Sequence, residues 1–107
     1  MAGSKKADLI ASCRAALRIP ADCLIYDDEI ADLISAARSA LRAGGVSEAM
    51  ATSDDDASVR VAVKVYVKAN FGMDNPDAER LMQSFRDMLC RMAGSTEHGT
   101  ATKAGAQ

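Results

Sequence analysis

The chain has 107 residues, a formal net charge of −2 and 49% hydrophobic residues, which fits one small domain. The composition excludes a collagen-like repeat, a disulfide scaffold and a membrane span, since no apolar stretch approaches the ~18 residues that a bilayer requires. A weakly acidic chain with 4% aromatic residues and no tryptophan is also a poor binder of nucleic acid.

The apolar composition indicates a thin core. Alanine supplies 21 of the hydrophobic residues, whereas leucine, isoleucine, valine and phenylalanine together number only 20. Small domains bury a modest fraction of their unfolded surface, so this chain is either marginally stable or gains burial from partners. Three widely spaced cysteines are typical of free thiols in a reducing compartment. We therefore expect a soluble protein that is made in the cytoplasm.

The first predicted helix runs from about Lys5 to Leu17. Its apolar residues form one stripe at helical spacing: Leu9, Ile10, Cys13, Ala16 and Leu17. Pro20 disfavours helical backbone in the residue before it, so the helix must end by Ile19.

The second helix is predicted from its ends as well as from its periodicity. Asp27 is expected to be the N-cap of a helix that opens with acidic residues and ends near Arg42. Its apolar residues recur every three or four positions, at Ile30, Leu33, Ile34, Ala37 and Leu41. The glycines at 44 and 45 supply the left-handed position after the helix. The connection at 46–56 is long for a helical bundle, which is typical of a functional loop.

The segment 59–67 carries contradictory signals. Its valines alternate strictly with other residues, at Val59, Val61, Val63, Val65 and Val67. Such alternation of β-branched residues is typical of a strand. The ends of the segment indicate a helix, because acidic residues 54–56 precede it, Lys64 and Lys68 lie in its second half, and Gly72 follows. No other segment offers a partner strand, so we predict a helix that is apolar nearly all round and buried on two sides.

The fourth helix is predicted to begin with Asn75 as N-cap and Pro76 as its first residue, and to end at Gly94. Its apolar residues follow helical spacing, at Ala78, Leu81, Met82, Phe85, Met88, Leu89 and Met92. We interpret its methionines as core filling rather than a binding surface. Residues 94–107 contain no large apolar side chain and are expected to be disordered.

These elements predict an all-α fold. It is a small antiparallel bundle of about four helices with a long central loop and a disordered C-terminal tail. We assign residues 1–93 to a helical domain and residues 94–107 to the tail.

Few residues are suited to chemistry. The potential soft metal ligands are Cys13, Cys23, Cys90 and His98. They lack the paired spacings of a metal site, so we expect no metal and interpret the cysteines as small buried hydrophobes. His98 falls in the predicted tail, where nothing orients it to activate a nucleophile. The acidic runs at 27–28 and 54–56 are explained by helix capping and dipole compensation. We therefore predict a non-enzymatic protein with no catalytic residues and no cofactor.

The order of the sequence features suggests a family. The features are, in order, Leu17-Arg18-Ile19, Asp27-Asp28-Glu29, Ile30-x-x-Leu33-Ile34-x-Ala36-Ala37, Gly45-Val46, Ala62-Val63, Asn75-Pro76-Asp77-Ala78, and Phe85 with Leu89. The most specific motif lies between Ala62-Val63 and Asn75. It consists of Tyr66, Val67, Lys68, Ala69, Asn70, Phe71 and Gly72. Over about residues 7–92 the chain resembles the head–tail connector (adaptor) proteins of tailed bacteriophages and prophages with long non-contractile tails.

The resemblance implies a small α-helical structural protein that assembles as a ring, usually dodecameric, beneath the portal protein of a DNA-filled head. Such a ring extends the DNA channel and gives a downstream stopper or tail-completion protein a docking surface. The implied partners are other copies of the chain, the portal protein and that downstream protein. DNA passes through without sequence-specific binding, and no membrane is involved. The implied location is the virion, at the head–tail interface, after synthesis in the host cytoplasm.

Charged residues give a hypothesis for the contacts between protomers. The residues predicted for this interface are Arg38, Arg42, Asp54, Asp55, Asp56, Lys64 and Lys68. The basic members would pair with the acidic run of a neighbouring protomer. The long connection and the polar tail would fold on docking.

Two other functions stay open at this stage. One is a small phage protein of DNA packaging or DNA recognition, such as a small terminase-like subunit, which the weak basicity disfavours. The other is a thiol-based regulatory protein that uses Cys13 or Cys90.

Overall fold

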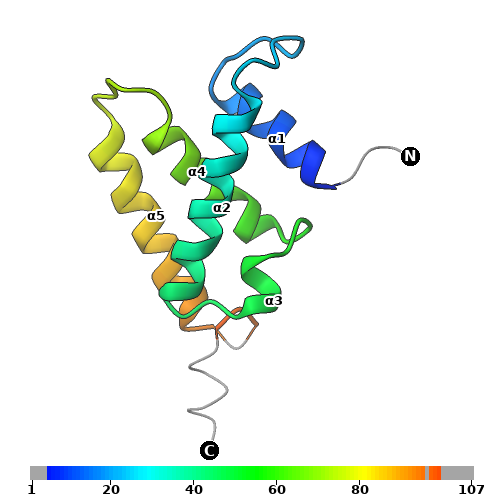
Figure 1. Cartoon of the computed structure of the whole chain (residues 1–107). Helices are drawn as coiled ribbons and strands as arrows, with labels where there is room; N and C mark the ends of the chain where they lie inside the picture. Colours follow the sequence, from blue (N-terminus) through cyan, green and yellow to red (C-terminus); the bar gives the residue numbers. More distant parts are fainter. Residues whose placement is uncertain (1–4, 96, 100–107) are drawn as a thin grey trace, which may run out of the picture.

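The computed structural model describes residues 5–95 and 97–99, with side chains from Asp8 onward, and this part of the chain contains five α-helices and no strand (Figure 1). Their bounds are α1 Lys5–Ala16, α2 Asp27–Ala43, α3 Glu48–Ala51, α4 Ala57–Asn70 and α5 Ala78–Ala93. The all-α prediction is confirmed. The four long helices make the bundle, and α3 is a single turn within the predicted long connection. No described helix is long and apolar enough to cross a membrane.

Helix α4 is central to the bundle and packs against α1, α2 and α5. Its alternating valines fit this position, because Val59, Val63 and Val67 are four residues apart and share one face of a helix. All three are at most 1% exposed, whereas Val61 on another face is 46% exposed. The prediction of a helix at this segment is confirmed. The alternation of the valines places one set of them in the core and leaves Val61 at the surface.

The core is built from all four long helices. Its largest fully buried side chains include Leu9 of α1, Ile30 and Leu41 of α2, and Phe85 of α5. The Phe85 ring meets Tyr66 of α4 edge to face, with ring centroids 5.0 Å apart. Phe85 is therefore a central residue of the packing between α4 and α5.

Two predicted helix caps are wrong. Helix α2 begins without a side-chain cap, because the Asp27 carboxylate accepts a hydrogen bond from Arg14 Nε of α1 at 2.8 Å. Helix α5 begins at Ala78, two residues later than predicted. There the Asn75 side chain accepts a hydrogen bond from the Asp77 N–H at 3.0 Å, which makes an Asx turn in place of the predicted cap.

Left-handed backbone ends both α1 and α2. In α2 Gly45 has a φ of +109° and so takes the predicted left-handed position, and the Val46 N–H donates to the Leu41 carbonyl in a Schellman turn. Helix α1 ends in the same way with Arg18 at a φ of +63°. A non-glycine residue rarely adopts this conformation, and here the Ile19 N–H donates to the Arg14 carbonyl at 2.9 Å across the turn.

The segment that follows α5 differs from the prediction. Val46 and Gly99 form an antiparallel bridge, and the Ser47 N–H donates to the His98 carbonyl at 2.7 Å. His98 is only 8% exposed. The predicted disorder is therefore wrong for Gly94, Ser95 and residues 97–99, because backbone and polar contacts hold them without large apolar side chains. The rest of the predicted tail, residues 96 and 100–107, lies outside the described residues, and the domain boundary at 93 stays a prediction.

Candidate interaction site

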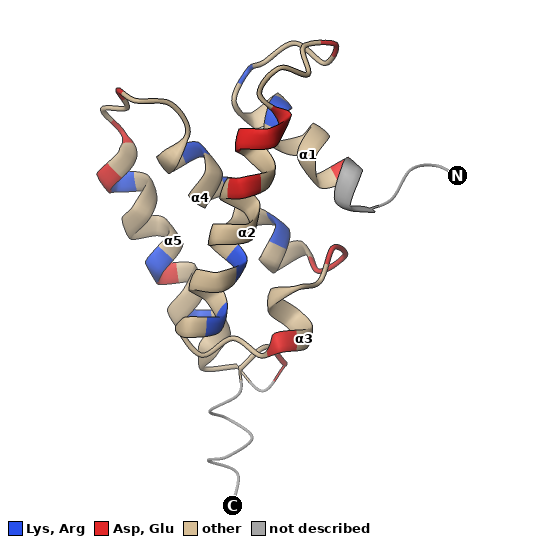
Figure 2. Ribbon diagram, viewed as in Figure 1, with Lys and Arg blue, Asp and Glu red and all other residues tan. Residues whose placement is uncertain are grey.

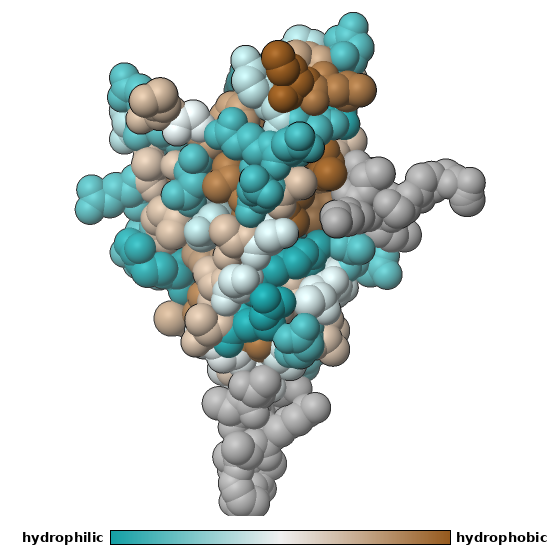
Figure 3. Space-filling model, in the orientation of Figure 1, coloured by the Kyte–Doolittle hydropathy of each residue, from teal (hydrophilic) through white to brown (hydrophobic). Residues whose placement is uncertain are grey.

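One end of the bundle presents apolar side chains to solvent. The loop between α1 and α2 exposes Leu24 by 60% and Ile25 by 79%. Edge-to-face packing of Tyr26 on Phe71, with ring centroids 5.5 Å apart, joins this loop to the end of α4. Figure 3 shows a brown patch at the top of the molecule, over the α1–α2 loop. We call residues 22–26 the apolar loop.

The surroundings of the apolar loop are mainly acidic, although the exposed Arg18 lies in the same connection. Carboxylates gather at the start of α2 and in the loop between α4 and α5 (Figure 2). Asp22 and Asp28 flank the two aliphatic side chains, and in the described part of the chain neither has a cation within ion-pair distance. This end of the molecule suits a partner with an apolar recess and a positive rim.

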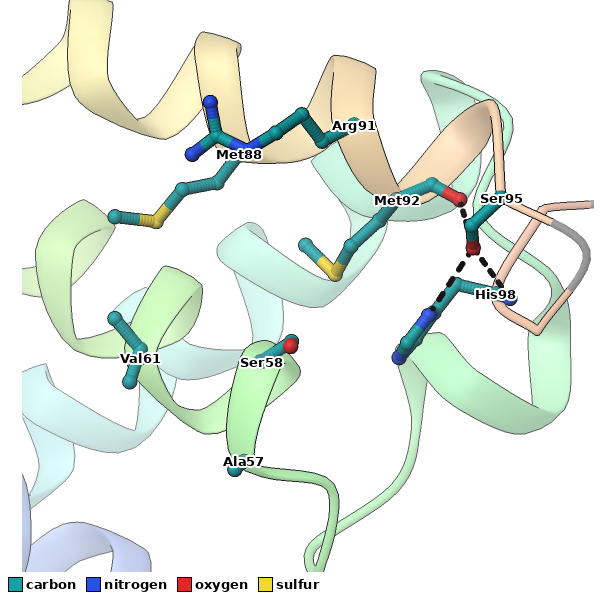
Figure 4. A pocket seen from close by; sticks show the side chains of 8 residues that line it. All are labelled: Ala57, Ser58, Val61, Met88, Arg91, Met92, Ser95 and His98. Atoms are coloured by element: carbon teal, nitrogen blue, oxygen red, sulfur yellow. Dashed lines mark hydrogen bonds between the residues drawn. The ribbon is translucent and has the colours of Figure 1, made fainter.

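A second apolar feature is a pocket of about 380 Å³ between α4 and α5 (Figure 4), which we call the α4–α5 pocket. Its lining residues are Ala57, Ser58 and Val61 of α4, Met88, Arg91 and Met92 of α5, and Ser95 and His98 beyond α5. Because Val61 is 46% exposed, the pocket opens to solvent. Arg91 is exposed beside it and pairs with no carboxylate among the described residues. The pocket therefore combines an apolar floor with a positive charge.

His98 is held at the edge of this pocket by Ser95 and Asp56. Its backbone N–H donates to Ser95 Oγ at 2.9 Å, and its Nδ1 lies 3.2 Å from the same oxygen. Its Nε2 lies 3.0 Å from Asp56 Oδ2, which also accepts a hydrogen bond from the Val59 N–H and so caps α4. The position of Asp56 at a helix start was predictable from the sequence. Its contact with His98 was not, because no spacing pattern signals a pair that is so distant in the chain.

The carboxyl of Asp56 gives this contact a testable dependence on pH. Burial raises the pKa of this carboxyl, but the hydrogen bonds from Val59 and His98 and the charge of His98 outweigh it and hold the pKa below its usual range. A lowered pKa stabilises the fold above the unfolded value of about 4, and this contribution is lost as the pH falls through the folded value. We expect wild type to lose more unfolding free energy than Asp56→Asn between about pH 5 and pH 3, measured by urea unfolding.

An exposed carboxylate provides the control for this experiment. Asp74 lies in the loop between α4 and α5 and is exposed. Asp74→Asn should follow the wild-type dependence on pH. If Asp56→Asn followed it as well, the contact with His98 would not contribute to acid stability.

Asp56, Glu97 and His98 also bring potential metal ligands together, with their ligand atoms within 4.8 Å of one another. One imidazole nitrogen and two carboxylates are donors that zinc accepts. Asp56 and His98 already bond to each other, however, and Glu97 is exposed. The hydrogen bonds account for this arrangement without a cation, and the expected lack of a metal stays a prediction.

Arg38 and Asp54, both predicted for a protomer interface, contact each other within the chain. Arg38 Nη1 donates to the carbonyls of Ala51 and Ser53, at 3.0 and 2.8 Å. Its Nη2 forms an ion pair with Asp54. Arg38 thus fastens α2 to the end of α3 and to the segment that follows it, and Asp54 has a partner without a second copy.

The remaining basic residues of that set are more accessible. Arg42 makes an exposed ion pair with Glu48, with 3.6 Å between Nε and Oε1. Lys64 and Lys68 lie one turn apart on α4. Lys64 is half-buried and Lys68 is exposed, and neither pairs with a carboxylate in the described part of the chain. Asp55 is also exposed. The pairing of these residues across protomers stays a prediction.

The thiols occupy different environments, since Cys13 is buried, Cys23 is half-buried and Cys90 is exposed. Burial raises the pKa of the Cys13 thiol to about 11, although the charges of Lys64 and Arg60 oppose the rise. Cys13 is therefore a protonated, inert thiol at neutral pH, which disfavours it as a redox sensor. The interpretation of all three cysteines as buried hydrophobes is wrong for Cys90, because it falls on the solvent side of α5.

The motif at 66–72 forms the end of α4 and the exit from it. The Tyr66 ring packs on α5, and the Phe71 ring packs on Tyr26 at the start of α2. Gly72 has a φ of +79°, a conformation that favours glycine. The contacts of this motif therefore fix where α4 ends and how the following loop meets α2.

The helical fold carries two apolar surface features, the apolar loop and the α4–α5 pocket, of the kind that contacts between proteins use. The comparison with known families agrees, because residues 9–99 match the model described as phage connector protein. The chain therefore belongs to the phage connector protein family, and the resemblance drawn from the sequence is confirmed. Proteins of this family are structural rather than enzymatic and interact with other head and tail proteins. No curated protein and no solved structure matches the chain.

Proposed function

We propose that this chain is a subunit of a ring that joins the portal of a DNA-filled phage head to the tail or to the next connector protein. The family match over residues 9–99 carries this proposal. In this role the ring extends the DNA channel, and a downstream stopper or tail-completion protein docks on it. The subunit acts in the virion, at the head–tail interface, after synthesis in the host cytoplasm.

The surface of the single chain supports a role in an assembly. Leu24, Ile25 and Val61 are 60%, 79% and 46% exposed, and their burial against a partner would add to a thin core. The net charge of −2 also suits the wall of a DNA channel, because a basic wall would hold the DNA by its phosphates.

The experiment that tests this proposal measures the solution mass of the protein over a concentration series. Light scattering and negative-stain images are recorded for the chain alone and for the chain mixed with a portal protein. Closed rings of about a dozen subunits, alone or on the portal, are the expected result. A chain that stays monomeric in both conditions overturns the proposal.

Lys64 and Lys68 provide a prediction about the interface between protomers. Reversing both charges, in Lys64→Glu/Lys68→Glu, is expected to weaken ring assembly by about tenfold. Charges near an interface set the rate at which two protomers associate and the alignment of their surfaces. Sedimentation or light scattering at low and high salt measures the effect, and salt should weaken wild-type assembly in the same direction. Arg80→Glu, an exposed change outside the predicted set, is the control. Unchanged assembly of the double variant would reject the charge pairing.

A further inference from the structure

The apolar loop and the α4–α5 pocket match in size and polarity. The loop projects two adjacent aliphatic side chains, Leu24 and Ile25, which are 60% and 79% exposed. The pocket offers about 380 Å³ beside Val61, Met88 and Met92, which is enough for one or two aliphatic side chains. Flexible methionine side chains adapt readily to such a guest.

The charges at the two features are complementary as well. Asp22 and Asp28 bracket the aliphatic residues of the loop, and Arg91 lines the pocket. In the part of the chain that the structure describes, none of these three residues is in an ion pair. A loop seated in the pocket would bring carboxylates to the guanidinium and so fix its orientation.

The loop and the pocket lie at opposite ends of the bundle. The contact of Tyr26 with Phe71 places the apolar loop beside the end of α4, whereas the pocket begins at Ala57, where α4 starts (Figures 1 and 4). A helix of 14 residues separates the two points by about 20 Å. A chain therefore cannot fill its own pocket with its own loop, so a loop seated in the pocket has to come from a second copy.

We propose that the apolar loop of one copy inserts Leu24 and Ile25 into the α4–α5 pocket of the next copy, and that this contact builds the ring. The inference rests on the proposed function, for which it supplies the interface. Two different surfaces meet in this contact, so each copy gives one loop and accepts another. Such a heterologous contact repeats from copy to copy and closes into a ring where the rotation between neighbours permits closure.

Two substitutions test the contact from its two sides. Ile25→Asp and Val61→Asp each place a charge in the apolar interface, at residues that are already exposed in the single chain. Each is expected to weaken self-association about tenfold or more, measured by light scattering. An equimolar mixture of the two variants should form heterodimers and nothing longer, because one variant keeps an intact pocket and the other an intact loop. Thermal unfolding by circular dichroism verifies that both variants fold.

Met73→Asp is the matched control for these variants. Met73 is fully exposed at the same end of the bundle but lies outside the apolar loop. This variant should assemble like wild type. The control separates the effect of a charge in the contact from that of an added charge at this end of the molecule.

The native cysteines provide a second test. Cys23 precedes the inserted residues, and the exposed Cys90 is next to Arg91 of the pocket. In the assembled protein a short bismaleimide should link these thiols between copies and give a ladder of oligomers on a denaturing gel. Cys23→Ser or Cys90→Ser should remove the ladder. A mixture of the two serine variants should give dimers only.

Each outcome decides between the inference and the proposed function. Rings that form normally in Ile25→Asp and Val61→Asp overturn the inference and leave the proposed function standing. Cross-links that survive in a variant with only one of these two cysteines replaced also overturn the inference. Such links would not join Cys23 of one copy to Cys90 of the next. Rings that form normally but no longer bind the portal would make the portal the occupant instead. A chain that is monomeric with and without the portal overturns both.

Discussion

Replacing Phe85 with alanine is expected to lower the free energy of unfolding by about 3–5 kcal/mol. Phe85 is 2% exposed and packs edge to face on Tyr66, with ring centroids 5.0 Å apart. The substitution leaves a cavity between α4 and α5 and also removes the aromatic contact. Small domains have total stabilities of about 5–15 kcal/mol, so this loss should lower the Tm by about 10 °C or more. Urea unfolding and thermal melts measure it.

The chain offers a matched control in its other phenylalanine. Phe71 is half-buried and packs on Tyr26 beside the apolar loop. Phe71→Ala should cost about 1–2 kcal/mol, because less apolar surface returns to water and solvent can fill the space. Equal losses in the two variants would show that the contact between α4 and α5 is not the main source of core stability.

The helices were predictable because their signals are local. Helix α4 illustrates this, since its valines alternate like those of a strand while residues 54–56 and Gly72 mark the ends of a helix. The structure confirms those ends, with the Asp56 side chain as the N-cap and Gly72 in left-handed backbone. The residues at the ends of the segment predicted the structure correctly despite the strand-like alternation, because a helix with valines four residues apart still buries a continuous face.

The side-chain partners were not predictable, because they depend on contacts between distant parts of the chain. Asp27 has the residue type of an N-cap, but Arg14 of α1 binds its carboxylate instead. His98 lies in a segment with no apolar pattern, yet it is 8% exposed, it bonds to Asp56, and the adjacent Gly99 forms the bridge to Val46. Local sequence patterns report where backbone turns and helices form. They do not report which polar groups meet once the helices pack.

The candidate interaction site also depends on contacts that local sequence patterns do not report. Leu24 and Ile25 lie between two helices, and an apolar pair in a connection has no periodicity that reveals its exposure. The pocket is formed by the start of α4 and the end of α5, so it exists only after the two helices pack antiparallel. The motif at 66–72 was a clear family signal, and its contacts within the chain indicate that it identifies the fold more directly than a binding surface.

Replacing Arg38 with alanine is expected to lower the free energy of unfolding by about 2–4 kcal/mol. The Arg38 side chain is 12% exposed, and its guanidinium binds Asp54 and the carbonyls of Ala51 and Ser53. Alanine would remove all of these charge-assisted hydrogen bonds at once and leave their acceptors unpaired in a half-buried loop. Arg38→Lys keeps the charge but not the planar fork, so its loss should be intermediate. Urea unfolding of the three proteins gives the comparison.

Arg42, one turn further along α2, is the matched control. Its side chain is 38% exposed and lies 3.6 Å from Glu48, whose side chain is 74% exposed. An exposed pair of this kind contributes at most about 1 kcal/mol, so Arg42→Ala should leave stability almost unchanged. If Arg38→Ala instead kept its stability and lost the ability to assemble, the guanidinium would act between protomers. The two variants therefore decide whether the arginines of α2 hold one chain together or join it to the next.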